Sequence, residues 1–109
     1  MLLAYLKDLL GIGKRKELLL EAIRRGPYII DVRTPQEYRM GHIQQAVNIP
    51  LELISKNADK IRKFDKPVIT CCQSGSRSGR AARRLRKKGI PEVLNGGGWV
   101  SLKDLMREA

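Results

Sequence analysis

The chain has 109 residues, a length that suits one compact domain and is too short for two of ordinary size. Hydrophobic residues make up 42% and aromatic residues 5%, so we expect a core of aliphatic side chains and alanine. The 22 basic and 11 acidic side chains leave a formal charge of +11, which argues against a protein that carries cations.

The chain begins with an expected short helical extension, residues 1–13, in which leucines recur at helical spacing until a Gly-Ile-Gly sequence breaks it. Its apolar run is about half as long as a membrane span requires, and it lacks the pattern of a secretory signal. We therefore expect no membrane span and a cytoplasmic protein. The rest of the chain, residues 14–109, is expected to form the domain, with a first helix at 14–25 and a buried strand at 28–32.

A capping box marks the start of the next helix. Thr34 stands at the cap, a proline follows at the first helical position, and Glu37 comes three residues after the cap. This pattern predicts a short helix over residues 35–40. A second short strand is then expected at 46–49, where a proline stops it.

The second half of the chain alternates in the same way. A helix is expected at 51–64, a strongly apolar strand at 67–71, a basic helix at 77–88 and a strand at 93–94, and three glycines then lead into a helix at 99–106. The strands are continuous apolar runs, which is typical of a sheet covered on both faces. We expect an α/β domain whose central, mostly parallel sheet has about four to five strands and helices on both faces.

The carboxyl end of the strand at 67–71 carries the most informative pattern, because sites in open α/β sheets lie beyond the carboxyl ends of strands. Cys72 leaves the strand there, and small residues lead from it into the basic helix. Backbone N–H groups of such a loop form an anion-binding nest, and the helix start adds positive charge. A cysteine in that position should have a lowered pKa and act as a nucleophile. The candidate anion-binding residues are Gln73, Ser74, Gly75, Ser76, Arg77 and Ser78.

The other cysteine adjoins Cys72, and the pair cannot form an ordinary disulfide. Neighbouring Cα atoms lie about 3.8 Å apart, whereas disulfides need roughly 4.4–6.8 Å. With one histidine and no spaced cluster of ligands, we expect no metal site. Free thiols also favour a reducing compartment.

Six motifs in order and spacing give the chain a likeness to a known family. They are Ile30-Asp31-Val32-Arg33, Pro35 with Glu37-Tyr38, Gly41-His42-Ile43, Ala46-Val47-Asn48-Ile49-Pro50, residues 72–78, and Asn95-Gly96-Gly97. Over about residues 15–106 the chain resembles a rhodanese-like domain. The resemblance implies a six-residue loop led by a catalytic cysteine, here Cys72. That cysteine takes a sulfane sulfur from a small anionic donor such as thiosulfate, holds it as a persulfide, and passes it to a thiol or cyanide, without a cofactor.

The polar residues around the loop have simpler expected roles. Asp31 either braces the loop through a hydrogen bond or pairs with Arg33, and we favour a structural role. Glu37 is explained by the capping box and by an ion pair, so we assign it no catalytic role. His42 is expected to be structural, and Trp99 to lie in the core or in the wall of the pocket.

A rival interpretation starts from Cys71. Cys71 and Arg77 have the C-x5-R spacing of cysteine phosphatases and arsenate reductases, in which the arginine clamps two oxygens of an oxyanion. Thr70 stands where the phosphatase motif has histidine, which favours Cys72 as the nucleophile. Neighbouring side chains of a strand also point to opposite faces, so Cys71 is expected to pack as a small buried residue.

A third interpretation is a binding module without catalysis, because the helix at 77–88 is rich in arginine and lysine. Base-stacking aromatic residues are scarce and known nucleic-acid motifs are absent, so nucleic acid is not the expected partner. The basic face is instead expected to be solvated, with two other roles open. Arg77 and Arg80 would steer the anionic donor, or the face would bind an acidic protein.

Overall fold

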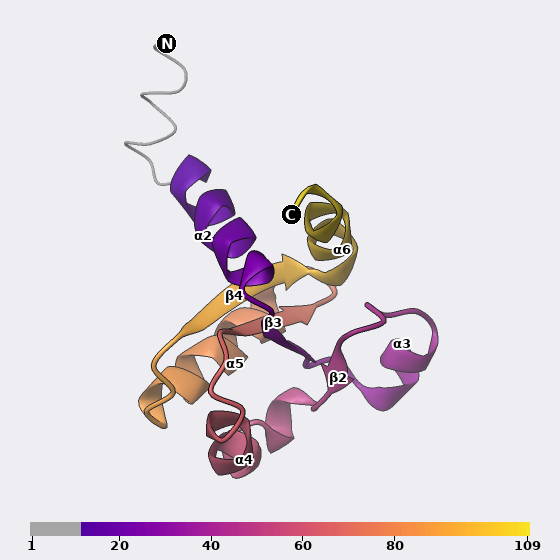
Figure 1. Ribbon diagram of the computed structural model, residues 1–109. Coiled ribbons are helices and arrows are strands. Elements are labelled where there is room, and N and C mark those ends of the chain that lie inside the picture. The colour runs from indigo at the N-terminus through magenta and orange to yellow at the C-terminus, as the bar shows by residue number, and fades with distance from the viewer. Residues whose placement is uncertain (1–11) are drawn as a thin grey trace.

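The computed structural model describes residues 12–109, and its centre is a sheet of four parallel strands in the order β2-β1-β3-β4 (Figure 1). The strands are β1 (Tyr28–Asp31), β2 (Val47–Asn48), β3 (Val68–Cys72) and β4 (Val93–Gly98). Most of the expected extension at 1–13 lies outside the described residues. No helix within residues 12–109 combines the length and the apolar character that a membrane crossing requires.

Helices cover both faces of the sheet, as the sequence predicts (Figure 1). One face packs against α2 (Ile12–Arg24) and α6 (Trp99–Glu108), and the other against α4 (Ala58–Arg62) and α5 (Ser76–Lys87). The short helix α3 (Pro35–Arg39) follows β1. Because α2 begins at residue 12, it includes part of the Gly-Ile-Gly sequence that was expected to separate extension from domain.

Alternation along the strands divides the core into two layers. Ile29 and Ile69 face α2 and α6, whereas Ile30 and Val68 face α4 and α5, and each is at most 2% exposed. Burying one such side chain stabilises the fold by about 1.5–3 kcal/mol. Both layers hold the strands in register, and this fixes where the carboxyl ends of β1 and β3 lie relative to each other.

The expected single helix over 51–64 is wrong. The segment forms two turns of 3-10 helix, Leu51–Leu53 and Ser55–Asn57, before α4 begins. At the junction the Asn57 side chain donates to the Leu53 carbonyl at 2.8 Å, and the Asn57 backbone N–H binds the Ile54 carbonyl at 3.1 Å. The side chain thus occupies the carbonyl that an α-helical bond from residue 57 would use, and the helix is interrupted.

The expected end of the last strand at residue 94 is also wrong, because the three glycines belong to β4. A Cβ atom at Gly96 would lie 2.7 Å from the Ile69 side chain and 2.8 Å from the Thr70 carbonyl oxygen. A glycine there allows β4 to lie close against β3, up to the irregular pairing next to Cys72. The glycines therefore bring β4 against the loop that follows Cys72.

Candidate active site

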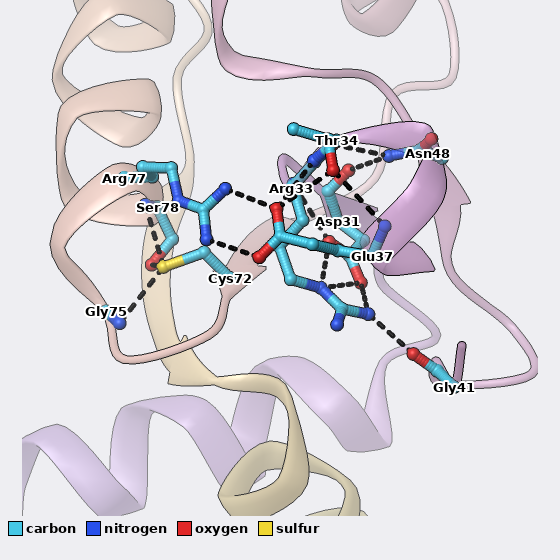
Figure 2. Close-up of polar contacts among 10 residues, drawn as sticks. All are labelled: Asp31, Arg33, Thr34, Glu37, Gly41, Asn48, Cys72, Gly75, Arg77 and Ser78. Atoms are coloured by element: carbon cyan, nitrogen blue, oxygen red, sulfur yellow. Dashed lines mark hydrogen bonds and ion pairs between the residues drawn. The ribbon is translucent and has the colours of Figure 1, made fainter. Parts of the chain in front are cut away.

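Cys72 is the last residue of β3, and the following loop turns back over its sulfur (Figure 2). The backbone N–H of Gly75 donates to Sγ at 3.0 Å and the N–H of Ser78 at 3.3 Å. The Ser78 hydroxyl lies 3.3 Å from the same sulfur. Cys72 is 1% exposed, so these contacts form in a largely water-free space. The sulfur therefore sits in a nest of hydrogen-bond donors at the start of α5.

These donors change the acidity of the thiol. Burial alone raises the pKa of Cys72, but hydrogen bonds from the hydroxyl and amide of Ser78 and from the amides of Gly75 and Ser74 outweigh it and lower the pKa below the ordinary value. The amino end of the twelve-residue helix α5 adds a positive partial charge. The arrangement favours a thiolate, which is the nucleophilic form of cysteine.

The loop keeps its shape through a glycine and an asparagine. Gly75 has φ +103°, a left-handed conformation that residues with a side chain adopt only at a cost. The Asn95 side chain donates to the Gly75 carbonyl at 3.1 Å and accepts from the Gly97 amide at 2.9 Å, and its oxygen lies 2.7 Å from the Ser78 hydroxyl. No role for Asn95 is predicted from the sequence, although it stands directly before the glycine run. It ties β4 to Gly75 within the loop and to Ser78 in the first turn of α5.

Cys71 lies in the opposite layer and in an opposite environment. Its side chain is fully buried among the residues under α2 and α6. This burial and, to a smaller extent, the nearby charge of Asp31 raise the pKa of Cys71 to about 12. A thiol so buried and so weakly acidic does not suit the nucleophile of a C-x5-R enzyme.

Asp31 and Arg33 form a buried ion pair beneath the site, 0% and 3% exposed (Figure 2). The Arg33 guanidinium binds both Asp31 carboxylate oxygens, with the shortest contact at 2.7 Å, and also donates to the Gly41 carbonyl at 2.7 Å. It lies 4.9 Å from the centre of the Trp99 ring. Of the two roles open to Asp31, the structure has the pairing with Arg33. Such a pair needs full hydrogen bonding to be tolerated in the core.

Arg77, which was expected to steer the anionic donor, forms an ion pair within the protein. Its guanidinium donates two hydrogen bonds to the Glu37 carboxylate, at 2.7 and 2.9 Å (Figure 2). Glu37 also closes the predicted capping box with Thr34, through contacts of 3.1 and 3.2 Å. The hydrogen bonds from Arg77 and then from the backbone of Thr34 lower the pKa of Glu37 to about 2. The loop arginine is thus paired at neutral pH.

The remaining loop residues form the rim of the site. Gln73, Ser74 and Ser76 are exposed, and so is Arg80 one turn further along α5. Within residues 12–109, no carboxylate pairs with the exposed α5 cations beyond Arg77. Two of these cations, Arg84 and Arg86, bind backbone carbonyls instead. The exposed cations of α5 beyond Arg77 are Arg80, Arg83, Arg84, Arg86 and Lys87. The helix therefore presents a basic face that starts beside the site.

Other candidate features carry no site chemistry. His42 stacks on the Tyr38 ring at 3.6 Å and its Nδ1 lies 2.6 Å from the Tyr38 carbonyl, which fits the expected structural role. A hollow of about 690 Å³ lies elsewhere, lined by Ile29, Ile43 and Met106 among others, without Cys72. In the described part of the chain, no three histidine, cysteine, aspartate or glutamate residues are grouped to hold a metal ion.

The fold and the loop define a class of protein: a parallel α/β domain in which a loop led by a cysteine joins a central strand to a helix. Within that class, the family model described as the rhodanese-like domain matches residues 15–104. The chain therefore belongs to the rhodanese-like family.

Individual relatives agree with this membership. The thiosulfate sulfurtransferase PspE of Escherichia coli is 38% identical over 77 residues, which cover 70% of this chain and 71% of PspE. The uncharacterized protein YqhL of Bacillus subtilis is 47% identical over 83 residues, covering 73% of this chain. The chain spans only 65% of the length of YqhL. The solved structure of a rhodanese with anions from E. coli matches with a TM-score of 0.63 and 34% identity, covering 69% of this chain and 89% of that one.

Proposed function

We propose that the protein is a sulfurtransferase in which Cys72 carries the sulfur. The observation that supports this most directly is the set of donors around the Cys72 sulfur, two backbone N–H groups and the Ser78 hydroxyl within 3.3 Å. The same donors that favour a thiolate would favour a persulfide anion, whose negative outer sulfur lies one S–S bond, about 2 Å, from Sγ. The sulfurtransferase PspE among the relatives adds support.

The reaction has two half-steps and needs no external oxidant or reductant, because the donor already supplies sulfur at the sulfane level. The Cys72 thiolate attacks the sulfane sulfur of the donor. A sulfur–sulfur bond forms, and the donor's own bond to that sulfur breaks. With thiosulfate, sulfite leaves with the bonding electrons, and Cys72 becomes a persulfide anion. A thiol or cyanide then attacks the outer sulfur and regenerates the thiolate. This is covalent catalysis of the ping-pong type.

We further propose that the sulfur acceptor is presented by an acidic protein. The exposed cations of α5, which begin with Arg80, have no carboxylate partner among the described residues, and the chain carries a formal charge of +11. Charges of one sign next to a site raise the association rate of an oppositely charged partner. Binding of such a protein should weaken as salt is added.

The test of the proposed function is the mass of the protein after reaction with thiosulfate. We expect one added sulfur atom that maps to Cys72 in a digest and disappears when cyanide is added. Hydrolysis of an aryl phosphate is measured beside it. Sulfur on Cys71 alone, or phosphate hydrolysis without sulfur uptake, would overturn the proposal. Binding to polyanions without turnover of either substrate would instead support the module without catalysis.

A further inference from the structure

The only cation within the loop of residues 72–77 is already neutralised. Arg77 gives both of its hydrogen bonds in the site to Glu37, and the two side chains are 30% and 35% exposed. The other charged pair near the sulfur is Asp31 with Arg33, and its two charges neutralise each other in the same way. In Figure 2 the Glu37 carboxylate lies between the Arg77 and Arg33 guanidinium groups. These two charged pairs thus cancel, and the backbone amides remain as the donors that face the sulfur, while the basic face of α5 begins one turn further along at Arg80.

We propose that Glu37 is a specificity-determining residue that selects singly charged sulfane-sulfur donors over doubly charged ones, because it withholds the Arg77 charge from the donor. This inference rests on the proposed sulfur transfer to Cys72. It gives Glu37 a role beyond the capping box. The selected class consists of monoanions with a terminal sulfur, such as thiosulfonates and persulfides.

The charge that the site must hold differs by one unit between the two classes of donor. Thiosulfate brings two negative charges to the thiolate, so three are present throughout the transfer to the persulfide and sulfite. Methanethiosulfonate has nearly the same shape, with a methyl group in place of one charged oxygen. It brings one charge, so two are present throughout the transfer to the persulfide and methanesulfinate. A site whose arginine is neutralised favours the second reaction relative to the first.

The position of Glu37 allows its charge to be removed without removing its structural role. Glutamine is also suitable at the third helical position of a capping box, so Glu37→Gln keeps a side-chain oxygen for Thr34 and frees Arg77. Arg77→Gln makes the opposite change and leaves the Glu37 carboxylate unpaired. Glu92 offers a matched control, because its carboxylate binds the Arg25 guanidinium through both oxygens at the start of β4, away from the carboxyl ends of the strands.

The experiment measures the second-order rate constant of sulfur loading on Cys72 for thiosulfate and for methanethiosulfonate, and takes their ratio in each variant. The ratio cancels effects on the intrinsic reactivity of Cys72. We expect the ratio to rise about five- to tenfold in Glu37→Gln, to fall by a similar factor in Arg77→Gln, and to stay at the wild-type value in Glu92→Gln. The rise should shrink as ionic strength increases.

An unchanged or lower ratio in Glu37→Gln, or the same shift in Glu92→Gln, would overturn the selectivity role. Circular dichroism establishes whether each variant folds. If Glu37→Gln does not fold, the ratio in Arg77→Gln tests the selectivity role, which requires that ratio to fall below the wild-type value. The double variant Glu37→Gln/Arg77→Gln should not show the rise in the ratio that is expected in Glu37→Gln. If neither donor loads Cys72 in the wild-type protein, the proposed function itself is wrong, which is distinct from loading without selectivity.

Discussion

The carboxyl end of β3 presents the same side chain to both faces of the sheet, with opposite results. Cys71 enters the layer under α2 and α6, where burial raises its pKa to about 12. Cys72 enters the layer under α5, where it is equally buried, but hydrogen bonds from the loop lower its pKa. Burial raises the pKa of both thiols, and only Cys72 has hydrogen-bond donors that outweigh it, whereas the charge of Asp31 raises the pKa of Cys71 further.

The reactivity of Cys72 is therefore a property of the loop backbone. Two of the groups that contact the Cys72 sulfur are amides, which any residue except proline would supply. The loop adopts its shape because Gly75 accepts a left-handed conformation and the Asn95 side chain binds Gly75 and Ser78. The predictions below alter one face or one donor at a time.

The largest effect should come from replacing each of the two cysteines by serine in turn. Cys72→Ser should lower the rate of sulfur transfer from thiosulfate to cyanide by more than about a thousandfold, because it removes the nucleophile. Cys71→Ser should retain the rate and instead lower the free energy of unfolding by about 1–3 kcal/mol, because a hydroxyl is left in an apolar layer. Comparable losses of rate in both variants would contradict the assignment.

The second largest effect should come from Gly75→Ala. An alanine at φ +103° is strained, and its Cβ would lie 3.4 Å from the Gly97 Cα, so the loop should shift and the amide should move from the sulfur. We expect sulfur loading to slow by about 10- to 100-fold, less than the roughly 100- to 1,000-fold cost of removing one preorganised donor, because the amide moves but is not removed. Gly26→Ala is the matched control, since Gly26 also has a positive φ but an open surrounding. It should lose stability alone, and an equal slowing there would refute the explanation.

A smaller effect is expected from Ser78→Ala. The Ser78 hydroxyl lies between the Cys72 sulfur and the Asn95 side-chain oxygen, at 3.3 and 2.7 Å. If it donates to the thiolate, its loss should raise the pKa of Cys72 and slow loading about threefold to tenfold near neutral pH. The pH profile of loading measures this, with Ser101→Ala on α6 as control. A lowered pKa would mean that Ser78 gives its proton to Asn95 and accepts from the thiol.

The smallest effect concerns stability in acid. The pKa of Glu37 is lowered to about 2 in the folded chain, from a model-compound value of 4.5. Its contribution is therefore fully present above pH 4.5 and is lost as the pH falls toward 2. Because the pair is partly exposed, we expect less than about 1 kcal/mol. The free energy of unfolding, measured with urea, should fall less steeply from pH 6 to pH 2 in Glu37→Gln than in the wild type. Parallel curves of free energy against pH would contradict this contribution.

Much of the fold follows from the sequence, because apolar runs and capping residues act over a few positions. The capping box at Thr34 and the strand expected at 67–71 are local patterns, and both are confirmed, the strand as Val68–Cys72. The glycines of β4 were misassigned because their reason lies in another strand: Gly96 must pass close to Ile69. The 3-10 turns before α4 depend on the orientation of one side chain, that of Asn57.

The candidate site divides in the same way. The position of Cys72 after a buried strand predicts a nest, since strand, loop and helix are contiguous in sequence. The partner of Arg77 was not predicted, because Glu37 lies 40 positions earlier and both residues already had an explanation. Asn95 was missed for a similar reason, since its contacts with Gly75 and Ser78 exist only when β4 pairs with β3.

Titration of the Cys72 thiol measures directly whether the loop donors lower its pKa. The ultraviolet absorbance of the thiolate is followed with pH in the Cys71→Ser protein, in which Cys72 is the only cysteine, and the double serine variant serves as the blank. The loop donors predict a midpoint clearly below the ordinary cysteine value of about 8.5. A midpoint at or above that value in the folded protein would contradict the account.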